Sequence, residues 1–128
     1  MEKLGKGIAK ELTGGDVLLL SGELGAGKTV FCKGVALGLG VKSQVVSPTF
    51  TIMNEHDGKA VKFCHFDAYR LADESEAYGA GVTDFIGNEL CVCAVEWWEN
   101  IESLFDGLKT VKVSINEIGS AREVVIER

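Results

Sequence analysis

The segment from Gly22 to Thr29 reads Gly-Glu-Leu-Gly-Ala-Gly-Lys-Thr and matches the phosphate-loop pattern G-x-x-x-x-G-K-[ST]. Its glycines permit backbone conformations in which several N–H groups point inward at phosphate oxygens. Lys28 would reach the β- and γ-phosphates, and the Thr29 hydroxyl would ligate Mg²⁺. We therefore predict a nucleoside triphosphate site built from Gly22, Glu23, Leu24, Gly25, Ala26, Gly27, Lys28 and Thr29.

Such a site also needs an acid at the end of a second buried strand, where it can hold Mg²⁺ and its water. Glu96 follows the apolar run Leu90–Val95 and is the predicted metal ligand, with an ordinary surface carboxylate as the alternative. Asp67 ends another strand-like segment, where it would orient the attacking water, assist the metal or only cap the next turn. Asp84 is a weaker candidate for either role.

Periodicity indicates the elements that must position these residues. An apolar strand at 16–21 precedes the phosphate loop and a helix at 28–39 follows it, as such a loop requires. The remaining expected elements are a helix from residue 4 that ends near 14–15, strands at 50–54 and 60–66 joined by a turn at 57–58, a strand at 90–95, a helix at 99–105 and a hairpin of 111–115 with 123–127. Interleaved strands and helices predict a single α/β domain over residues 1–128.

Composition excludes several classes of protein. The 128 residues are 46% hydrophobic and 25% charged, as in a globular domain, and we expect no membrane span and no signal peptide. The four cysteines, at 32, 64, 91 and 93, show no metal or redox spacing, so we expect buried core residues in a reducing cytoplasm. A net charge of −6 argues against direct binding of DNA or other nucleic acid.

The acidic residues are concentrated in one block. Residues 71–108 contain nine acids and no Lys or Arg, whereas the rest of the chain is slightly basic. We interpret the block as a solvated face or, alternatively, as a docking surface for a basic partner.

Motifs that are absent from the sequence reduce the number of nucleotides and reactions to be considered. No N-K-x-D motif is present, so ATP is favoured over GTP. Small-molecule kinases usually close an arginine-bearing lid, yet two of the three arginines, Arg122 and Arg128, fall in the predicted last hairpin. Only Arg70 remains as a candidate phosphate or partner contact, and His65 is interpreted as structural. Of the adjacent Trp97 and Trp98, one should enter the core while the other could stack on a base or a partner.

Four blocks in this order, GELGAGKT (22–29), SPTF (47–50), HFDAYRL (65–71) and VEW (95–97), resemble the bacterial TsaE family, also called YjeE. The resemblance implies a P-loop NTPase-like three-layer sandwich with a mostly parallel central sheet. It implies an ATPase that acts with TsaD and TsaB, which attach threonylcarbamoyl to adenosine 37 of tRNA, so that tRNA is contacted only through the complex.

By the same resemblance, Lys28 would hold phosphates, Thr29 and Glu96 would hold Mg²⁺, and Asp67 would serve catalysis. Thr49 would lie in a switch-like loop beside the γ-phosphate, and Trp97 matches the tryptophan that follows the acid in the family. The chain departs from the family pattern at its start, because Leu4-Gly5 follows only three residues. We therefore expect the N-terminal edge strand to be missing.

Two other functions stay open at this stage. One is a stand-alone small-molecule or protein kinase, which would give a phosphorylated acceptor. The other is a nucleotide-binding module without catalysis, for which replacing Asp67 and Glu96 would change nothing.

Overall fold

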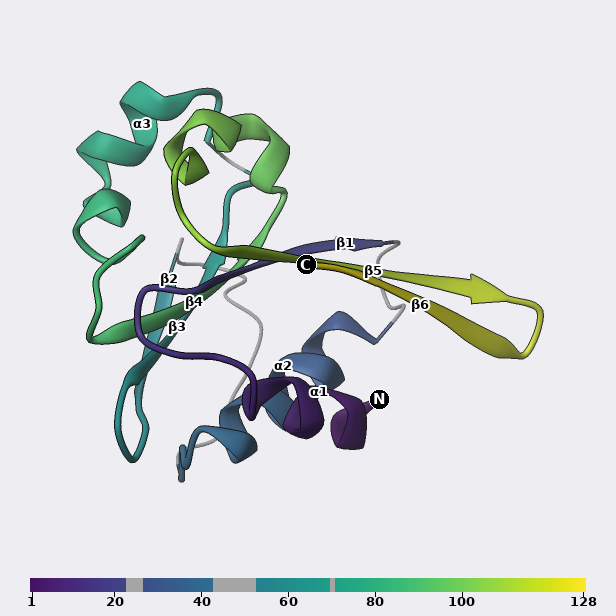
Figure 1. Ribbon diagram of the computed structural model, residues 1–128. Helices are drawn as coiled ribbons and strands as arrows, with labels where there is room; N and C mark the ends of the chain where they lie inside the picture. The colour runs from purple at the N-terminus through teal and green to yellow at the C-terminus, as the bar shows by residue number, and fades with distance from the viewer. Residues whose placement is uncertain (23–26, 43–52, 70) are drawn as a thin grey trace.

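The computed structural model describes residues 1–22, 27–42, 53–69 and 71–128 (Figure 1). It contains helices α1 (Glu2–Ala9), α2 (Lys28–Gly38) and α3 (Glu74–Gly79), the 3₁₀ segments η1 (Val82–Asp84) and η2 (Trp98–Phe105), and strands β1 (Val17–Gly22), β2 (Met53–Asp57), β3 (Lys62–Asp67), β4 (Cys91–Glu96), β5 (Thr110–Ile118) and β6 (Ala121–Glu127).

The strands form one six-stranded sheet in the order β2-β3-β4-β1-β5-β6. The four inner strands run parallel, and each edge strand pairs antiparallel with its neighbour through a hairpin. The C-terminal ends of β1, β3, β4 and β5 therefore meet along one side of the sheet, which we call the carboxyl edge. Ligands of open α/β sheets bind outside this edge.

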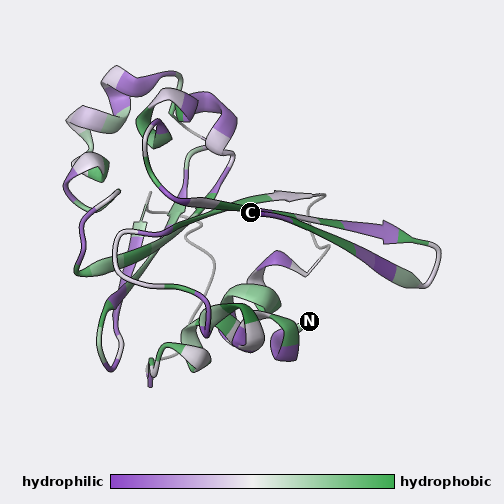
Figure 2. Ribbon diagram, viewed as in Figure 1, coloured by the Kyte–Doolittle hydropathy of each residue, from purple (hydrophilic) through white to green (hydrophobic). Residues whose placement is uncertain are grey.

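Both faces of the sheet are covered, which makes three layers (Figure 1). Leu18 and Leu20 of β1 join the core beneath α1 and α2, whereas Val17 and Leu19 join the core that contacts α3, η1 and η2. This division follows from the two-residue period of a strand, and it explains why the β1 sequence is apolar on both faces. In Figure 2 the hydrophobic residues gather on the central strands, and hydrophilic residues lie on the outer sides of the helices and on β5 and β6 shortly before and after their turn.

Helices α1 and α2 pack unusually closely because glycines line their contact. A Cβ added at Gly5 would overlap the carbonyl oxygen of Phe31, and one added at Gly34 would overlap that of Glu2. Without side chains at these two points, the backbones touch. This contact fixes the position of α2, and therefore of its first turn, which follows the phosphate loop.

The fold confirms the predicted α/β architecture and differs in detail. The first helix ends at Ala9 and continues as a turn, rather than as a helix reaching residues 14–15. The segment expected to be an α-helix at 99–105 is 3₁₀ instead, with a non-helical φ of −134° at Ile101, whose side chain is fully buried. The strand expected at 50–54 is described from Met53 and continues to Asp57, so the turn lies at 58–61 rather than at 57–58, and β3 begins at Lys62; residues 50–52 lie outside the described part of the chain.

All four cysteines are free and buried, as predicted. Within the described ranges, no helix has the length and apolar character needed to cross a membrane.

Candidate functional site

Three residues share one row across the carboxyl edge. Leu20 of β1 lies opposite Glu96 of β4, and Glu96 lies opposite Asp67 of β3. Residues in register on neighbouring strands point to the same face, and Leu20 belongs to the core under α2. The two predicted carboxylates therefore lie side by side, next to the strand that leads into the phosphate loop.

The residues that flank the loop have the backbone that the motif requires. Gly22 and Gly27 have φ angles of 138° and 105°, in the region that disfavours side chains. Lys28 and Thr29 open α2, so the positive end of the helix dipole faces the loop. The predicted loop residues Glu23, Leu24, Gly25 and Ala26 lie outside the described residues.

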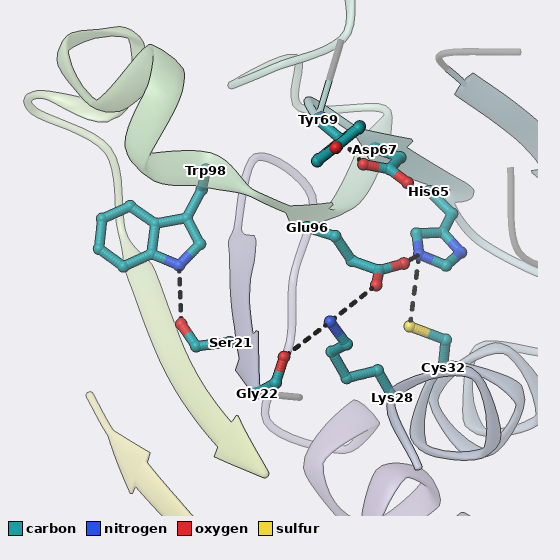
Figure 3. Close-up of polar contacts among 9 residues, drawn as sticks. All are labelled: Ser21, Gly22, Lys28, Cys32, His65, Asp67, Tyr69, Glu96 and Trp98. Atoms are coloured by element: carbon teal, nitrogen blue, oxygen red, sulfur yellow. Dashed lines mark hydrogen bonds and ion pairs between the residues drawn. The ribbon is translucent and has the colours of Figure 1, made fainter. Parts of the chain in front are cut away.

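A chain of polar contacts connects α2, β4 and β3 (Figure 3). The Nζ of Lys28 donates to the carbonyl oxygen of Gly22 at 3.0 Å and lies 3.4 Å from Oε1 of Glu96. The second carboxylate oxygen, Oε2, lies 2.8 Å from Nε2 of His65, and that nitrogen is 3.9 Å from Sγ of Cys32. Glu96 is 7% exposed and His65 0%. Both oxygens of a buried carboxylate are thus engaged.

Two periodicities bring these side chains together. Lys28 and Cys32 are four residues apart and face the sheet from the same side of α2. His65 lies two residues before Asp67 on β3, so it points to the same face, towards α2. Because β3 and β4 are neighbours, His65 reaches Glu96 from the adjacent strand.

The contacts shift the pKa values of both buried partners. Burial lowers the pKa of His65, but Cys32 and the Glu96 carboxylate beside Nε2 outweigh burial and raise that pKa. Burial raises the pKa of Glu96, and the bond and charge of His65 together with Lys28 outweigh it, so the pKa is lowered. Glu96 is therefore a carboxylate at neutral pH, the form that a metal ligand needs.

Asp67 is half-buried beside Glu96, and its Oδ1 accepts a hydrogen bond from the backbone N–H of Tyr69 at 2.9 Å. The turn cap considered from the sequence is therefore present. The role in orienting water stays a prediction, which the register of Asp67 with Glu96 permits. The competing acid, Asp84, lies in η1, in the layer on the other face of the sheet from Lys28.

The adjacent tryptophans point in different directions, as predicted. Trp98 packs against the core, and its Nε1 donates to Oγ of Ser21 at 3.1 Å. Trp97 is 49% exposed, and its ring meets the ring of Tyr69 edge-on with centroids 5.1 Å apart. A cavity of about 70 Å³ beside the loop is lined by Leu20, Ser21, Gly22, Lys28, Trp97 and Glu99. Trp97 therefore borders the same space as Lys28.

The structure thus brings together Lys28, Glu96 and Asp67, with Thr29 and Trp97 beside them. Thr49 and Arg70, two further predicted residues, lie outside the described part of the chain. Sequence reasoning missed the contact of His65 with Glu96 and treated this histidine as merely structural. The available signal was its position two residues before Asp67, on the same face of a strand.

The order of the sheet, the glycine-flanked loop and the carboxylates at the carboxyl edge define a protein with a P-loop NTPase-like fold. Residues 1–124 match the family model described as threonylcarbamoyl adenosine biosynthesis protein TsaE. The chain belongs to the TsaE family, and the family name places it in the biosynthesis of threonylcarbamoyladenosine in tRNA.

Relatives of known identity agree with this assignment. The TsaE protein of Bacillus subtilis is 49% identical over 88 residues, which cover 69% of this chain and 54% of the relative. The TsaE protein of Treponema pallidum is 35% identical over 120 residues, covering 93% of this chain and 87% of the relative. The crystal structure of Bacillus subtilis YdiB superposes with a TM-score of 0.70 at 34% identity, over 98% of this chain and 78% of that one. The matched stretch thus spans just over half of the first relative.

Proposed function

We propose that this chain is the Mg²⁺-dependent ATP-hydrolysing component of the tRNA threonylcarbamoyladenosine machinery, acting in the cytoplasm with TsaB and TsaD. The observation that carries the proposal is the meeting of Lys28 and Glu96, with a separation of 3.4 Å, at the end of the strand that enters the phosphate loop. Membership of the TsaE family supports the pathway.

Lys28 is the cation that would contact the β- and γ-phosphates. Its Nζ now bonds to the Gly22 carbonyl oxygen and pairs with Glu96. A bound triphosphate would draw Nζ from Glu96 to phosphate oxygens, and this change would leave Oε1 of Glu96 for the metal. The positive end of α2 adds to the attraction for phosphate.

The donors at the site suit Mg²⁺. This ion prefers oxygen ligands and keeps several waters, so it needs only one or two groups from a protein. The Thr29 hydroxyl and the Glu96 carboxylate would be those groups, and the bound ion would neutralise charge that develops on the phosphates. His65 holds Oε2 of Glu96 at 2.8 Å, so the carboxylate would keep its direction and Oε1 would be left for the metal or its water.

Asp67 would orient the attacking water. It shares the row of Glu96, and its second oxygen is not the one that caps the turn at Tyr69. Trp97 borders the space beside Lys28 and would contact the nucleotide.

The proposal assigns tRNA binding to the partners because the surface of this chain is poorly suited to it. Nine acids and no basic residue in 71–108 make a poor surface for tRNA, because nucleic-acid binding depends on Lys and Arg. Binding of tRNA would therefore fall to TsaD and TsaB, with this chain supporting their turnover through hydrolysis.

Reconstitution with TsaB and TsaD tests the proposal. We expect slow hydrolysis of ATP by the chain alone, and many rounds of tRNA modification only when chain, partners and ATP are all present. Lys28→Ala should abolish both, whereas Lys33→Ala, on the same helix, should abolish neither. Modification that runs for many turnovers without the chain would contradict the proposal, and transfer of phosphate to an added acceptor would favour the kinase instead.

A further inference from the structure

The two oxygens of the Glu96 carboxylate have different surroundings. Oε1 lies 3.4 Å from Nζ of Lys28, at the start of α2, and Oε2 lies 2.8 Å from Nε2 of His65 on β3. Figure 3 shows the two oxygens pointing apart, one towards the lysine and the other towards the histidine. Oε1 is therefore the oxygen on the side of the proposed nucleotide site.

The hydrogen bond to Oε2 is buried and costly to break. His65 is fully buried, and an ionised carboxylate can only accept hydrogen bonds, so Nε2 is the donor. Within the described ranges of the chain, Nδ1 of the same ring has no hydrogen-bond partner. If the bond to Glu96 broke, Nε2 would keep only Sγ of Cys32, at 3.9 Å, among the contacts described above. A buried donor that loses its partner in this way pays its full desolvation cost.

This arrangement limits how Glu96 could bind a divalent ion. Mg²⁺ is small, requires octahedral geometry and retains several waters, so a single carboxylate oxygen is sufficient for it. Ca²⁺ is larger, takes more oxygen ligands in a flexible geometry, and often takes both oxygens of one carboxylate. Glu96 could offer both oxygens only by giving up its bond to His65.

We propose that His65 determines which ion the site accepts: by holding Oε2 it restricts Glu96 to one ligand oxygen, and this restriction favours Mg²⁺ over Ca²⁺. His65 is a positioning residue that acts through Glu96 and does not touch the ion. The inference rests on the proposed function, because it assumes a divalent ion bound at Glu96 together with the nucleotide. It goes beyond that function by assigning the choice of ion to a side chain of β3.

Binding of a non-hydrolysable ATP analogue, measured by calorimetry with MgCl₂ and with CaCl₂, tests the assignment. The readout is the ratio of the two Kd values, since a variant that is merely less stable changes both values alike. Wild type should bind the analogue more tightly with Mg²⁺. His65→Leu should weaken binding with Mg²⁺ about tenfold, as loss of a residue that orients a metal ligand commonly does. Binding with Ca²⁺ should stay unchanged or become tighter, because both oxygens of Glu96 are then available.

Two further variants show whether the hydrogen bond itself is responsible. His65→Gln places an amide N–H donor at a similar reach, so it should recover most of the preference for Mg²⁺. Cys64→Ala is the matched control, because Cys64 is a fully buried neighbour on the same strand whose side chain belongs to the core on the other face of the sheet. It should leave the ratio of the two Kd values as in wild type.

Each outcome bears on the inference. Equal affinities of wild type with Mg²⁺ and Ca²⁺ would overturn it, whether or not His65→Leu folds. An unchanged ratio in His65→Leu would also overturn it, as would an equally large fall of the ratio in Cys64→Ala, which would indicate a general loss of structure. In each of these cases wild type still binds the analogue, so the proposed function stands. If wild type bound the analogue with neither ion, the proposed function itself would fail.

Discussion

The bond between His65 and Glu96 should make these two residues energetically coupled. His65 is fully buried, and its Nε2 lies 2.8 Å from Oε2 of Glu96. His65→Leu removes the donor at similar volume and leaves a buried carboxylate oxygen without this partner. A lost hydrogen bond to a charged group costs about 1.5–3 kcal/mol, so we expect the free energy of unfolding to fall by about 3 kcal/mol once imperfect packing is included. Melting should then occur about 10 °C lower.

A double-mutant cycle isolates the pair. Glu96→Met removes the carboxylate and keeps the length of the side chain, and the double variant joins two apolar residues in place of the polar pair. Replacing both partners of a buried pair costs far less than breaking it, so the double variant should be more stable than the sum of single losses predicts. We expect a coupling energy of about 2 kcal/mol.

Urea unfolding, followed by the fluorescence of Trp97 and Trp98, measures all four proteins. Equal denaturant slopes would show that the comparison concerns the same folded state. Cys32→Ala combined with Glu96→Met is the control cycle, because Sγ of Cys32 lies 3.9 Å from His65 and has no direct bond to Glu96 in Figure 3. If the losses of His65→Leu and Glu96→Met add to within about 0.5 kcal/mol, the two residues are not coupled and the reasoning is refuted.

Three further predictions use other parts of the structure. Gly5→Ala should destabilise the protein by several kcal/mol because the new Cβ would overlap the backbone of α2, whereas Gly7→Ala, with open space around it, should stabilise α1 by about 0.5–1 kcal/mol; thermal melting of both variants checks this. Asp67→Asn should keep the bond from the Tyr69 N–H and therefore the melting temperature, yet lose ATP hydrolysis, and an equally active variant would remove Asp67 from catalysis. The pKa of Glu96 is lowered in the folded protein, so its stabilising contribution is complete above the ordinary value of 4.5 and is lost as pH falls through the folded pKa. The melting temperature of wild type should therefore drop more steeply in acid than that of Glu96→Gln, and parallel curves would contradict this assignment.

Much of the site is encoded locally and was therefore predictable. The phosphate loop is eight consecutive residues with a strand before it and a helix after it, and β1 (Val17–Gly22) and α2 (Lys28–Gly38) confirm both elements. The carboxylates were identified because each ends a strand, and a strand end needs no knowledge of its neighbours. Short apolar runs interleaved with helical periods were sufficient to predict an α/β domain.

Other features depended on which strands are neighbours. The sequence contains His65 and Glu96 31 residues apart, and only the pairing of β3 with β4 turns them into a hydrogen-bonded pair. The form of η2 was also decided by packing, because burial of Ile101 overrides the helical pattern of 99–105.

The position of Arg122 shows the same division most clearly. From the sequence alone it belonged to a terminal hairpin, and that hairpin is present as β5 and β6. The proximity of the Arg122 side chain to Gly27 is set by the parallel pairing of β1 with β5 and by the length of β5 beyond Gly22. Local sequence determines the type of an element and the chemistry it carries. Long-range strand pairing decides which of these functional side chains come into contact. The energy of that pairing comes from burial and from backbone hydrogen bonds between distant segments, which no local pattern contains.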